Sequence, residues 1–284
     1  MIHPLRIAHR GASAQAPENT LAALEMAIQE GVDLLEIDVR ASADGEVVVI
    51  HDPTLDRTTD RTGLVAELTY DEILKADAGS WFSRKFAKEA IPTLAEVLEL
   101  ARHRAVVLIE IKADHMAEKV LQQIQAVDAQ DGVVIQSFEA ETVRRVNLID
   151  PTTPTALLMG EFPKAPSRLR ARRLAREVLG VGANTLSIWH AALTPVFHEE
   201  MRKRGLSVWV WTVDEDIVMR DMTQLGVQGI ITNHPQRLNQ VLADLEQQGA
   251  ILSPLGRRQR LKPSRWGRRR RLRRLGDQHR RDGG

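Results

Sequence analysis

The feature that most constrains the fold is a repeated alternation of short apolar runs with longer amphipathic stretches. Most runs of strand length are followed by a stretch with helical periodicity. The strand-like runs are 5–8, 33–39, 47–50, 106–111, 133–136, 155–158, 185–188, 208–212 and 229–232. The helix-like stretches are 20–30, 113–126, 140–148, 167–179, 195–204, 215–225 and 236–247. This alternation predicts a parallel sheet covered by helices.

The number of repeated units favours one parallel fold over another. About eight strand–helix units in about 250 residues are typical of a TIM (β/α)8 barrel. A doubly wound sheet is the alternative, but no G-x-G-x-x-G sequence follows the first run, as it would in a dinucleotide-binding sheet. We therefore expect a TIM barrel.

Two stretches depart from this alternation. Residues 34–52 have the pattern of two strands joined by a turn at Asp44-Gly45. Residues 53–91 are too long for an ordinary loop, so we expect a small insertion after the second β/α region, at the mouth of the site. Thr93 and Glu96 then form a capping-box pattern that starts another helix.

Charge divides the chain into two regions, although the net charge is only +1. Residues 257–282 hold thirteen basic and two acidic side chains, which leaves +11 there and −10 in the rest. We expect a catalytic domain over 1–248 and an Arg-rich disordered tail over 249–284. A reading of another class is that this tail binds an anionic membrane surface or nucleic acid by charge.

The composition also excludes several kinds of chemistry. The chain has no cysteine, which rules out disulfides, thiolate catalysis and Cys-type zinc sites. No apolar run approaches the ~20 residues of a transmembrane segment, and the N-terminal stretch lacks the apolar core of a signal peptide. We expect a cytoplasmic protein.

Polar side chains recur where the strand-like runs end. In a barrel these ends meet at one mouth, so groups far apart in sequence are expected to share a site. Alone each is weak evidence, because a single histidine is more often structural and neighbouring charges often form plain salt bridges. The residues are His9, Arg10, Glu36, Asp38, His51, Asp52, Glu110, Lys112, Gln136, Ser137, Trp211, Asn233 and His234.

Three of these residues are carboxylates suited to a hard cation. Glu36 and Asp38 are two apart on a strand and therefore point to the same face. Glu110 ends another run and is expected at the same mouth. Carboxylates held together in this way predict a Mg²⁺ or Ca²⁺ site.

Four more of these residues fit phosphoryl chemistry. Arg10 and Lys112 supply positive charge for a phosphate. His9 and His51 have the unperturbed pKa, near ~6.5, that suits a general acid and a general base. Together with a cation, they predict a metal-dependent hydrolase acting on a phosphate ester.

The order and spacing of several motifs are similar to those of the glycerophosphodiester phosphodiesterase family. The resemblance covers about 5–238, and it implies a TIM barrel with a small insertion after the His-Asp motif. The motifs are His9-Arg10-Gly11, Pro17-Glu18-Asn19-Thr20, Glu36-Ile37-Asp38-Val39, His51-Asp52, Asp56-Arg57-Thr58-Thr59, Gly79-Ser80-Trp81-Phe82, Ile91-Pro92-Thr93-Leu94, Glu110-Ile111-Lys112, Ser137-Phe138 and Trp211-Thr212-Val213.

The resemblance implies metal-dependent hydrolysis of a glycerophosphodiester to sn-glycerol 3-phosphate and an alcohol. It implies that His9 and His51 are the acid–base pair, but leaves open which is the acid. The attacking group, water or the glycerol 2-hydroxyl, also stays open. The remaining implied roles are cation binding by Glu36, Asp38 and Glu110, phosphate binding by Arg10 and Lys112, a place in the same pocket for Glu18, and packing on the glycerol by Trp211.

An alternative within the same fold is a lysophospholipase D, which needs an apolar groove for an acyl chain. Such a groove could be formed by Trp81, Phe82, Phe86 and Trp189. Two positions depart from the family pattern, because Asp214 replaces the usual Asn and Asn233-His234 replaces the usual Asp before Pro235. We expect neither position to touch the acid–base or metal residues, so that only substrate detail is affected.

Overall fold

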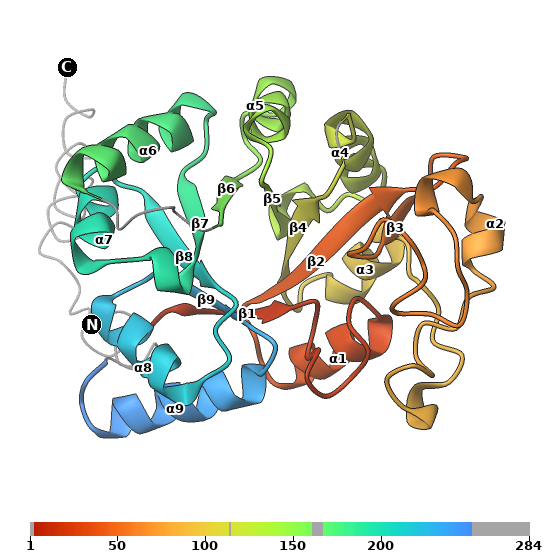
Figure 1. Ribbon diagram of the computed structural model, residues 1–284, viewed down its shortest axis with the longest axis horizontal. Coiled ribbons are helices and arrows are strands. Elements are labelled where there is room, and N and C mark those ends of the chain that lie inside the picture. The colour runs from red at the N-terminus through yellow and green to blue at the C-terminus, as the bar shows by residue number, and fades with distance from the viewer. Residues whose placement is uncertain (1–2, 114, 161–166, 252–284) are drawn as a thin grey trace, which may run out of the picture.

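A closed barrel of eight parallel strands forms the body of the molecule (Figure 1). The computed structural model describes residues 3–113, 115–160 and 167–251. The first strand pairs with both the second and the last, which closes the sheet and confirms the TIM barrel. The strands are β1 (Leu5–His9), β2 (Leu34–Ala41), β4 (Val106–Ile111), β5 (Val133–Ser137), β6 (Thr155–Met159), β7 (Thr185–Trp189), β8 (Ser207–Trp211) and β9 (Gly229–Thr232).

Helices surround this barrel and begin where the sequence places capping residues. Thr20 accepts a hydrogen bond from the amide of Ala23, and Thr93 with Glu96 forms the predicted capping box. The helices are α1 (Leu21–Gln29), α3 (Leu94–Ala101), α4 (Ala117–Ala126), α5 (Ala140–Ile149), α6 (Arg168–Gly180), α7 (Pro195–Arg202), α8 (Asp216–Leu225) and α9 (Pro235–Gln247). No helix in the described ranges is both long and apolar enough to cross a bilayer, and the predicted cytoplasmic location stays a prediction.

Side chains inside the barrel change from apolar to ionisable along the strands. Near the strand starts, Ile7, Leu34, Leu108 and Trp209 pack together and fill the interior. Because alternate residues of a strand face the same side, the next inward positions hold His9, Glu36, Glu110 and Trp211. The apolar layer therefore forms the floor under a polar layer at the carboxyl ends of the strands.

The two departures from the alternation appear as a hairpin and an inserted segment. Strand β3 (Val47–Val49) pairs antiparallel with β2, after a turn at Gly45 whose φ of +89° favours glycine. Residues 53–91 then lie between β3 and α3, on the right of Figure 1. They contain α2 (Tyr70–Ile73) and pack around a small core that includes Leu55, Val65 and Ile73. This confirms the predicted insertion.

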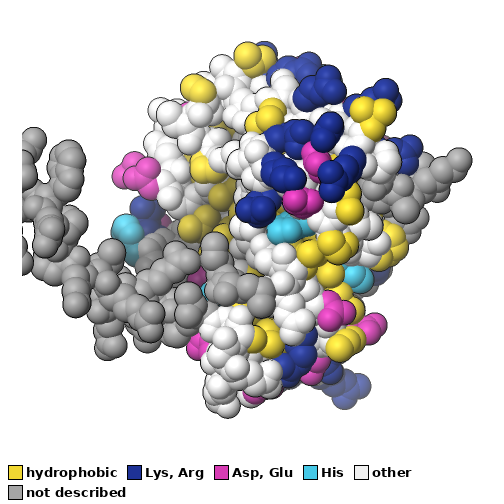
Figure 2. Space-filling model, turned by 90° about the vertical axis from the view of Figure 1, so that its left-hand side faces the viewer, with side chains coloured by type: hydrophobic (Ala, Val, Ile, Leu, Met, Phe, Trp, Pro, Cys, Tyr) yellow, Lys and Arg dark blue, Asp and Glu magenta, His cyan; other side chains and the backbone are white. Residues whose placement is uncertain are grey.

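Charged side chains cover the α6 and α7 side of the barrel, where Figure 2 shows basic groups with acidic ones among them. Glu200 is 2% exposed and accepts hydrogen bonds from Arg172 and Arg204. Lys203 pairs with Glu199 at 2.7 Å. The α6 and α7 side is therefore rich in basic side chains, although residues 1–256 together carry a net negative charge. The predicted tail falls, beyond residue 251, outside the described residues.

Candidate active site

A cavity of about 170 Å³ opens at the carboxyl ends of the barrel strands. One side, which we call the charged wall, is formed by His9, Arg10, Glu36, His51, Glu110 and Lys112. The opposite side, which we call the uncharged wall, is formed by Gln136, Phe138, Leu158, Trp211, Thr212 and Ile231. All predicted catalytic residues line this cavity, and so do Arg10, Glu36, Glu110, Lys112 and Trp211.

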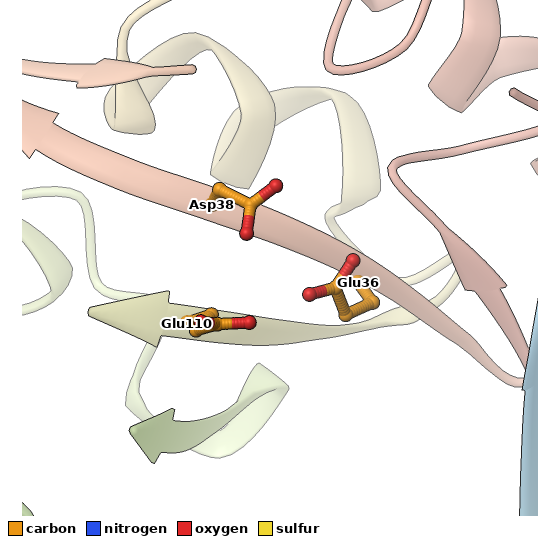
Figure 3. A group of neighbouring side chains, drawn as sticks. All are labelled: Glu36, Asp38 and Glu110. Carbon is orange, nitrogen blue, oxygen red and sulfur yellow. The ribbon is translucent and has the colours of Figure 1, made fainter. Parts of the chain in front are cut away.

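Three buried carboxylates lie together at the charged wall (Figure 3). Each of Glu36, Asp38 and Glu110 offers an oxygen within 4.8 Å of the others. Among the described residues, no other three His, Cys, Asp or Glu side chains come together in this way. Asp38 and Glu110 are neighbours in register across β2 and β4. Two carboxylates predicted on one face and a third predicted at the same mouth are thus brought together.

Burial and mutual repulsion separate the pKa values of these carboxylates. Burial, together with Asp38, raises the pKa of Glu110 from 4.5 to about 7 and raises that of Glu36 well above 4.5. Burial also opposes ionisation of Asp38, but Arg10 and Lys112 outweigh it and lower its pKa to about 2. Asp38 is therefore the carboxylate that stays ionised, whereas Glu36 and Glu110 hold a proton to higher pH unless a divalent cation adds to the charge of Arg10 and Lys112.

Arg10 and Lys112 provide the positive charge around Asp38. Lys112 Nζ is 3.0 Å from Asp38 Oδ1 and also contacts Glu110 Oε1. Arg10 Nε is 3.0 Å from Asp38 Oδ2, and its Nη1 donates to Glu18 at 2.8 Å. With all five ionised, the three carboxylates and two cations carry a net charge of −1. The predicted phosphate-binding side chains are thus already beside the carboxylates.

The backbone of the first strand end is shaped to bring these groups together. Arg10 has a φ of +57°, and its amide donates to the carbonyl and the side chain of Glu36. The next residue, Gly11, has a φ of +83°, and a Cβ there would lie 2.6 Å from the backbone of Ala23. Only glycine fits this turn against α1, which accounts for the glycine of His9-Arg10-Gly11.

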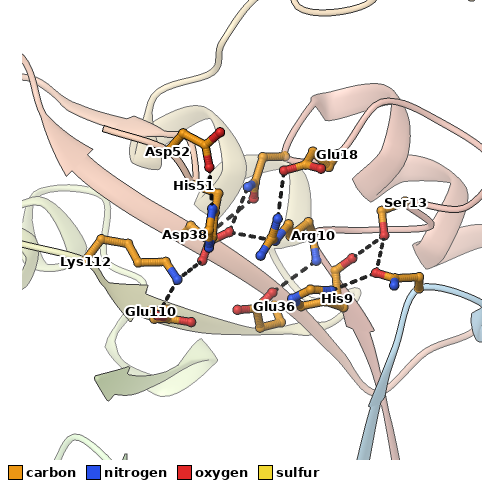
Figure 4. Close-up of polar contacts among 12 residues, drawn as sticks. His9, Arg10, Ser13, Glu18, Glu36, Asp38, His51, Asp52, Glu110 and Lys112 are labelled. Atoms are coloured by element: carbon orange, nitrogen blue, oxygen red, sulfur yellow. Dashed lines mark hydrogen bonds and ion pairs between the residues drawn. The ribbon is translucent and has the colours of Figure 1, made fainter. Parts of the chain in front are cut away.

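His51 is held by a charged network that begins at Asp52 (Figure 4) and continues into the inserted segment through Arg57. His51 Nδ1 lies 2.6 Å from Asp52 Oδ1, and Arg57 binds Asp52 at 2.6 and 3.1 Å. Arg57 also donates to both oxygens of Glu18, which in turn binds Arg10. Arg57 first, and then His51, holds the pKa of Asp52 well below its usual value. Glu18 does not line the cavity but links two arginines beside it.

His9 is held differently, by an uncharged amide. His9 Nδ1 lies 2.7 Å from Asn233 Oδ1, and Asn233 Nδ2 donates to Asp214 Oδ2 at 2.7 Å. Burial, aided by Arg10, lowers the pKa of His9 from 6.5 to about 4. The expectation that the two departures from the family pattern avoid the acid–base residues is wrong. They contact each other, and one of them contacts His9.

The uncharged wall is dominated by an aromatic pair. Trp211 and Phe138 meet edge to face, with their ring centroids 5.6 Å apart. None of the four aromatic residues predicted to form an acyl groove lines the cavity in the described part of the chain. Trp81, Phe82 and Phe86 instead pack together in the inserted segment, and Trp189 contacts His190.

Two residues of the charged network received no role from the sequence. Asn19, buried and at a φ of +59°, donates to Asp38 Oδ2 at 2.9 Å and accepts from its amide. Arg57 lies 39 residues from Glu18 and five from Asp52. Both occur within quoted motifs, but only the folded insertion and the turn after β1 bring them to the site.

A larger hollow of about 770 Å³ lies at the other end of the barrel, where the strands begin. Its lining includes Asp33, Arg102, His103 and Val106. It lacks the carboxylate group found among the described residues at the opposite end. Because barrel enzymes place their active sites at the carboxyl ends of the strands, the smaller cavity is the candidate site.

Comparison with known proteins gives a consistent result. The model of the glycerophosphoryl diester phosphodiesterase family matches residues 9–237. The glycerophosphodiester phosphodiesterase of Caldanaerobacter subterraneus subsp. tengcongensis is 38% identical over 240 residues, which cover 82% of this chain and 96% of the relative.

Solved structures agree with this match. The glycerophosphodiester phosphodiesterase of Agrobacterium tumefaciens superposes with a TM-score of 0.72 at 34% identity, covering 83% of this chain and 99% of the other. A phosphodiesterase of Oleispira antarctica, solved with the product sn-glycerol-3-phosphate, superposes with a TM-score of 0.76 at 28% identity, covering 84% and 97%.

Proposed function

The chain belongs to the glycerophosphoryl diester phosphodiesterase family, and from this premise we propose that it hydrolyses glycerophosphodiesters to sn-glycerol 3-phosphate and an alcohol. The observation that carries the proposal is the charged wall, which puts two imidazoles, two cations and two carboxylates around one cavity, with the Asp38 carboxylate close to both carboxylates. The product bound in the Oleispira relative supports the same substrate class.

The carboxylates fit a divalent cation, Mg²⁺ or Ca²⁺. Asp38 Oδ1 and Glu110 Oε1 are buried, and both contact the same Lys112 ammonium. Such hard oxygen donors are the ligands these ions prefer. Glu36, Asp38 and Glu110 would hold the cation, which supplies charge neutralisation at a phosphoryl oxygen and lowers the pKa of a bound hydroxyl.

The charges at the site favour an added cation. When Glu36, Asp38 and Glu110 are ionised, Arg10 and Lys112 offset only two of the three negative charges, and Arg10 is shared with Glu18. Arg10 and Lys112 then offset the negative charge that grows on the phosphoryl oxygens as the bond to the leaving group breaks. Their burial strengthens this effect, because water screens a buried charge less.

His9 and His51 are proposed as the acid–base pair. Both bind a neighbour through Nδ1, which leaves Nε2 of each ring for a bound substrate. One imidazole takes the proton from the attacking oxygen, and the other protonates the leaving oxygen. Water and the glycerol 2-hydroxyl both remain compatible as the attacking group, as does either assignment of acid and base.

The uncharged wall suits the glycerol part of the substrate. Trp211 and Phe138 present ring surface to the cavity, and Trp211 is proposed to pack on the glycerol carbons. The lysophospholipase D alternative loses support, because the residues proposed for an acyl groove lie outside this cavity. We infer that the substrate is small and water-soluble.

The test is an assay for sn-glycerol 3-phosphate release from glycerophosphocholine and glycerophosphoethanolamine. It is run with Mg²⁺, with Ca²⁺ and with a chelator, using the full chain. Metal-dependent release is expected from both substrates, and a chelator should abolish it. If no metal gives release, the proposal fails. Choline release from lysophosphatidylcholine would then support the lysolipid alternative.

We also propose that residues 1–248 form the catalytic unit and that 249–284 are an addition that binds anionic surfaces. A chain ending at residue 251 should retain turnover on glycerophosphocholine within about twofold. It should lose binding to anionic phospholipid vesicles, which the full chain is expected to show at low salt. Equal binding by both chains, or a large loss of turnover, would contradict this division.

A further inference from the structure

A chain of hydrogen bonds joins the ring of His9 to a carboxylate for which the proposed reaction has no use. Asn233 Oδ1 lies 2.7 Å from His9 Nδ1, and Asn233 Nδ2 is 2.7 Å from Asp214 Oδ2. Asp214 follows β8, Asn233 follows β9 and His9 ends β1. The carboxyl ends of β8, β9 and β1, where the first and last strands close the barrel, are thus linked.

Asp214 determines which way the amide of Asn233 points. A carboxylate only accepts hydrogen bonds, so the group facing Asp214 Oδ2 has to be the NH₂ of Asn233. The other carboxylate oxygen of Asp214, Oδ1, accepts hydrogen bonds from the backbone N–H of Asn233 at 2.9 Å and from the Thr232 hydroxyl at 3.0 Å. The carbonyl oxygen of the Asn233 side chain must then face His9.

The orientation of this amide in turn selects the form of the His9 ring. An amide oxygen accepts hydrogen bonds, so His9 Nδ1 has to carry the hydrogen. A neutral imidazole has only one nitrogen-bound hydrogen, which leaves Nε2 with a free lone pair. The Ser13 hydroxyl lies 2.8 Å from the same Asn233 oxygen and 2.7 Å from the His9 carbonyl oxygen, and its single hydrogen can be donated to only one of them.

We propose that Asp214 and Asn233 are positioning residues that fix neutral His9 as the Nδ1–H tautomer, with Nε2 unprotonated toward the cavity. The effect of this tautomer on turnover rests on the proposed function, whereas the tautomer itself does not. Neither residue touches the reacting atoms. Their role is to prevent the ring from presenting the wrong nitrogen to the substrate.

The isosteric change Asp214→Asn replaces one carboxylate oxygen, an acceptor, by an NH₂ group, a donor. The backbone N–H of Asn233 and the Thr232 hydroxyl would hold the new side-chain oxygen at position 214. The new NH₂ at that position would then face the Asn233 side chain. The Asn233 side chain then has to turn its oxygen to that NH₂ and its own NH₂ to His9. His9 Nδ1 becomes an acceptor, and the ring hydrogen moves to Nε2.

The rescue exchanges the two side chains, in Asp214→Asn with Asn233→Asp. The carboxylate at position 233 accepts both from the amide at 214 and from His9 Nδ1–H, which restores the original tautomer. Asp216→Asn is the matched control, because it makes the same chemical change two residues away on an exposed side chain that pairs loosely with Arg237.

The experiment combines ¹H–¹⁵N long-range correlation spectra of ¹⁵N-histidine-labelled protein at pH 7.5 with steady-state kinetics. The signals of His9 are assigned by their loss in His9→Gln. We expect wild-type protein, the exchanged variant and Asp216→Asn to show the hydrogen on Nδ1, and Asp214→Asn to show it on Nε2. We expect kcat of Asp214→Asn to fall at least about tenfold with KM changed less than threefold, and to recover in the exchanged variant.

The tautomer result decides the proposal even if the protein shows no turnover on any diester. An Nε2–H tautomer in the wild type, or an unchanged tautomer in Asp214→Asn, would overturn it. If Asp214→Asn fails to fold, the exchanged variant still decides, because an Nε2–H ring in it would contradict the proposal. Loss of kcat without a change of tautomer would show a merely structural role.

Discussion

The two walls of the cavity differ in charge, in origin and in what they can do. Every residue of the charged wall comes from positions 9–112, and every residue of the uncharged wall comes from positions 136–231. The first half of the barrel also carries the hairpin and the inserted segment, whereas the described residues of the second half form neither. The proposed roles therefore place the chemistry on one half of the barrel and the packing of the substrate on the other.

This difference explains why the halves need different support. Seven ionisable groups, the six of the charged wall and Asp38, lie together and require partners, which include Asn19, Glu18 and Arg57. Most of the uncharged wall needs only shape and apolar packing. Polar links from the second half to the first include Gln136 Nε2, which donates to Glu36 Oε1 at 3.3 Å, and the Asp214–Asn233 pair, which supports His9.

The largest expected effect separates the walls by kcat. His9→Ala and His51→Ala should each reduce kcat by about 10²- to 10⁴-fold, because each removes a proton-transfer group, while leaving the fold intact. The double variant should be little worse than either single one, since the two act in one step sequence. Steady-state kinetics on glycerophosphocholine, with circular dichroism to check folding, measures this. Near-native kcat in both single variants would contradict the acid–base assignment.

The second effect concerns the carboxylates of the charged wall and depends on pH. Because Glu110 has its pKa raised from 4.5 to about 7 on folding, its ionisation destabilises the cation-free protein as pH rises through that range. A bound divalent cation favours the ionised form, so it should stabilise the protein more at pH 8 than at pH 5.

Thermal unfolding with Mg²⁺, with Ca²⁺ and with a chelator at the two pH values tests this prediction. Glu110→Gln is the matched variant, and it should show a smaller cation-induced rise in Tm with little pH dependence from this group. His9 acts in the opposite sense, because its pKa is lowered from 6.5 to about 4 and its contribution to stability is lost as pH falls through that range. An equal cation effect at both pH values would count against the triad as the cation site.

The third effect lies on the uncharged wall and should appear in KM. Trp211→Ala removes ring surface that packs on the substrate, and we expect KM to rise about tenfold, or ~1.4 kcal/mol, with kcat changed less than threefold. Trp211→Phe keeps an aromatic ring and should recover most of the loss. A fall in kcat as large as that of His51→Ala would break the division between the walls.

The smallest effect tests the link between the insertion and the charged wall. Arg57→Gln removes the charge that binds both Asp52 and Glu18, and we expect kcat to fall a few-fold through a less ordered His51. The loss of stability should stay below about 1 kcal/mol, because the Arg57 side chain is 45% exposed and its ion pairs are screened by water. Arg61→Gln, which changes an arginine of the same segment that hydrogen-bonds to a backbone carbonyl, is the control. Equal kinetics for both variants would remove Arg57 from the site.

The sequence was sufficient for the parts of the site that depend on one strand at a time. Apolar runs and their parity predicted the strands and placed Glu36 with Asp38 on one face. The contacts that it missed join segments far apart, such as Arg57 with Glu18, and they depend on how the insertion packs. The error over Asn233 has the same cause. Only the register Ala8↔Thr232 between β1 and β9 places the next residues, His9 and Asn233, side by side.

The bond between His9 and Asn233 spans 224 residues, and this has a consequence for how the protein is made. At 5–20 residues per second, roughly 11–45 s separate the synthesis of the two residues. The first strand stays without its last partner during that interval, since β9 completes the ring. Glu36, Asp38 and Glu110 are therefore synthesised long before Asn233, which holds His9. We expect turnover to begin only after the barrel has closed, because the proposed orientation of His9 needs Asn233.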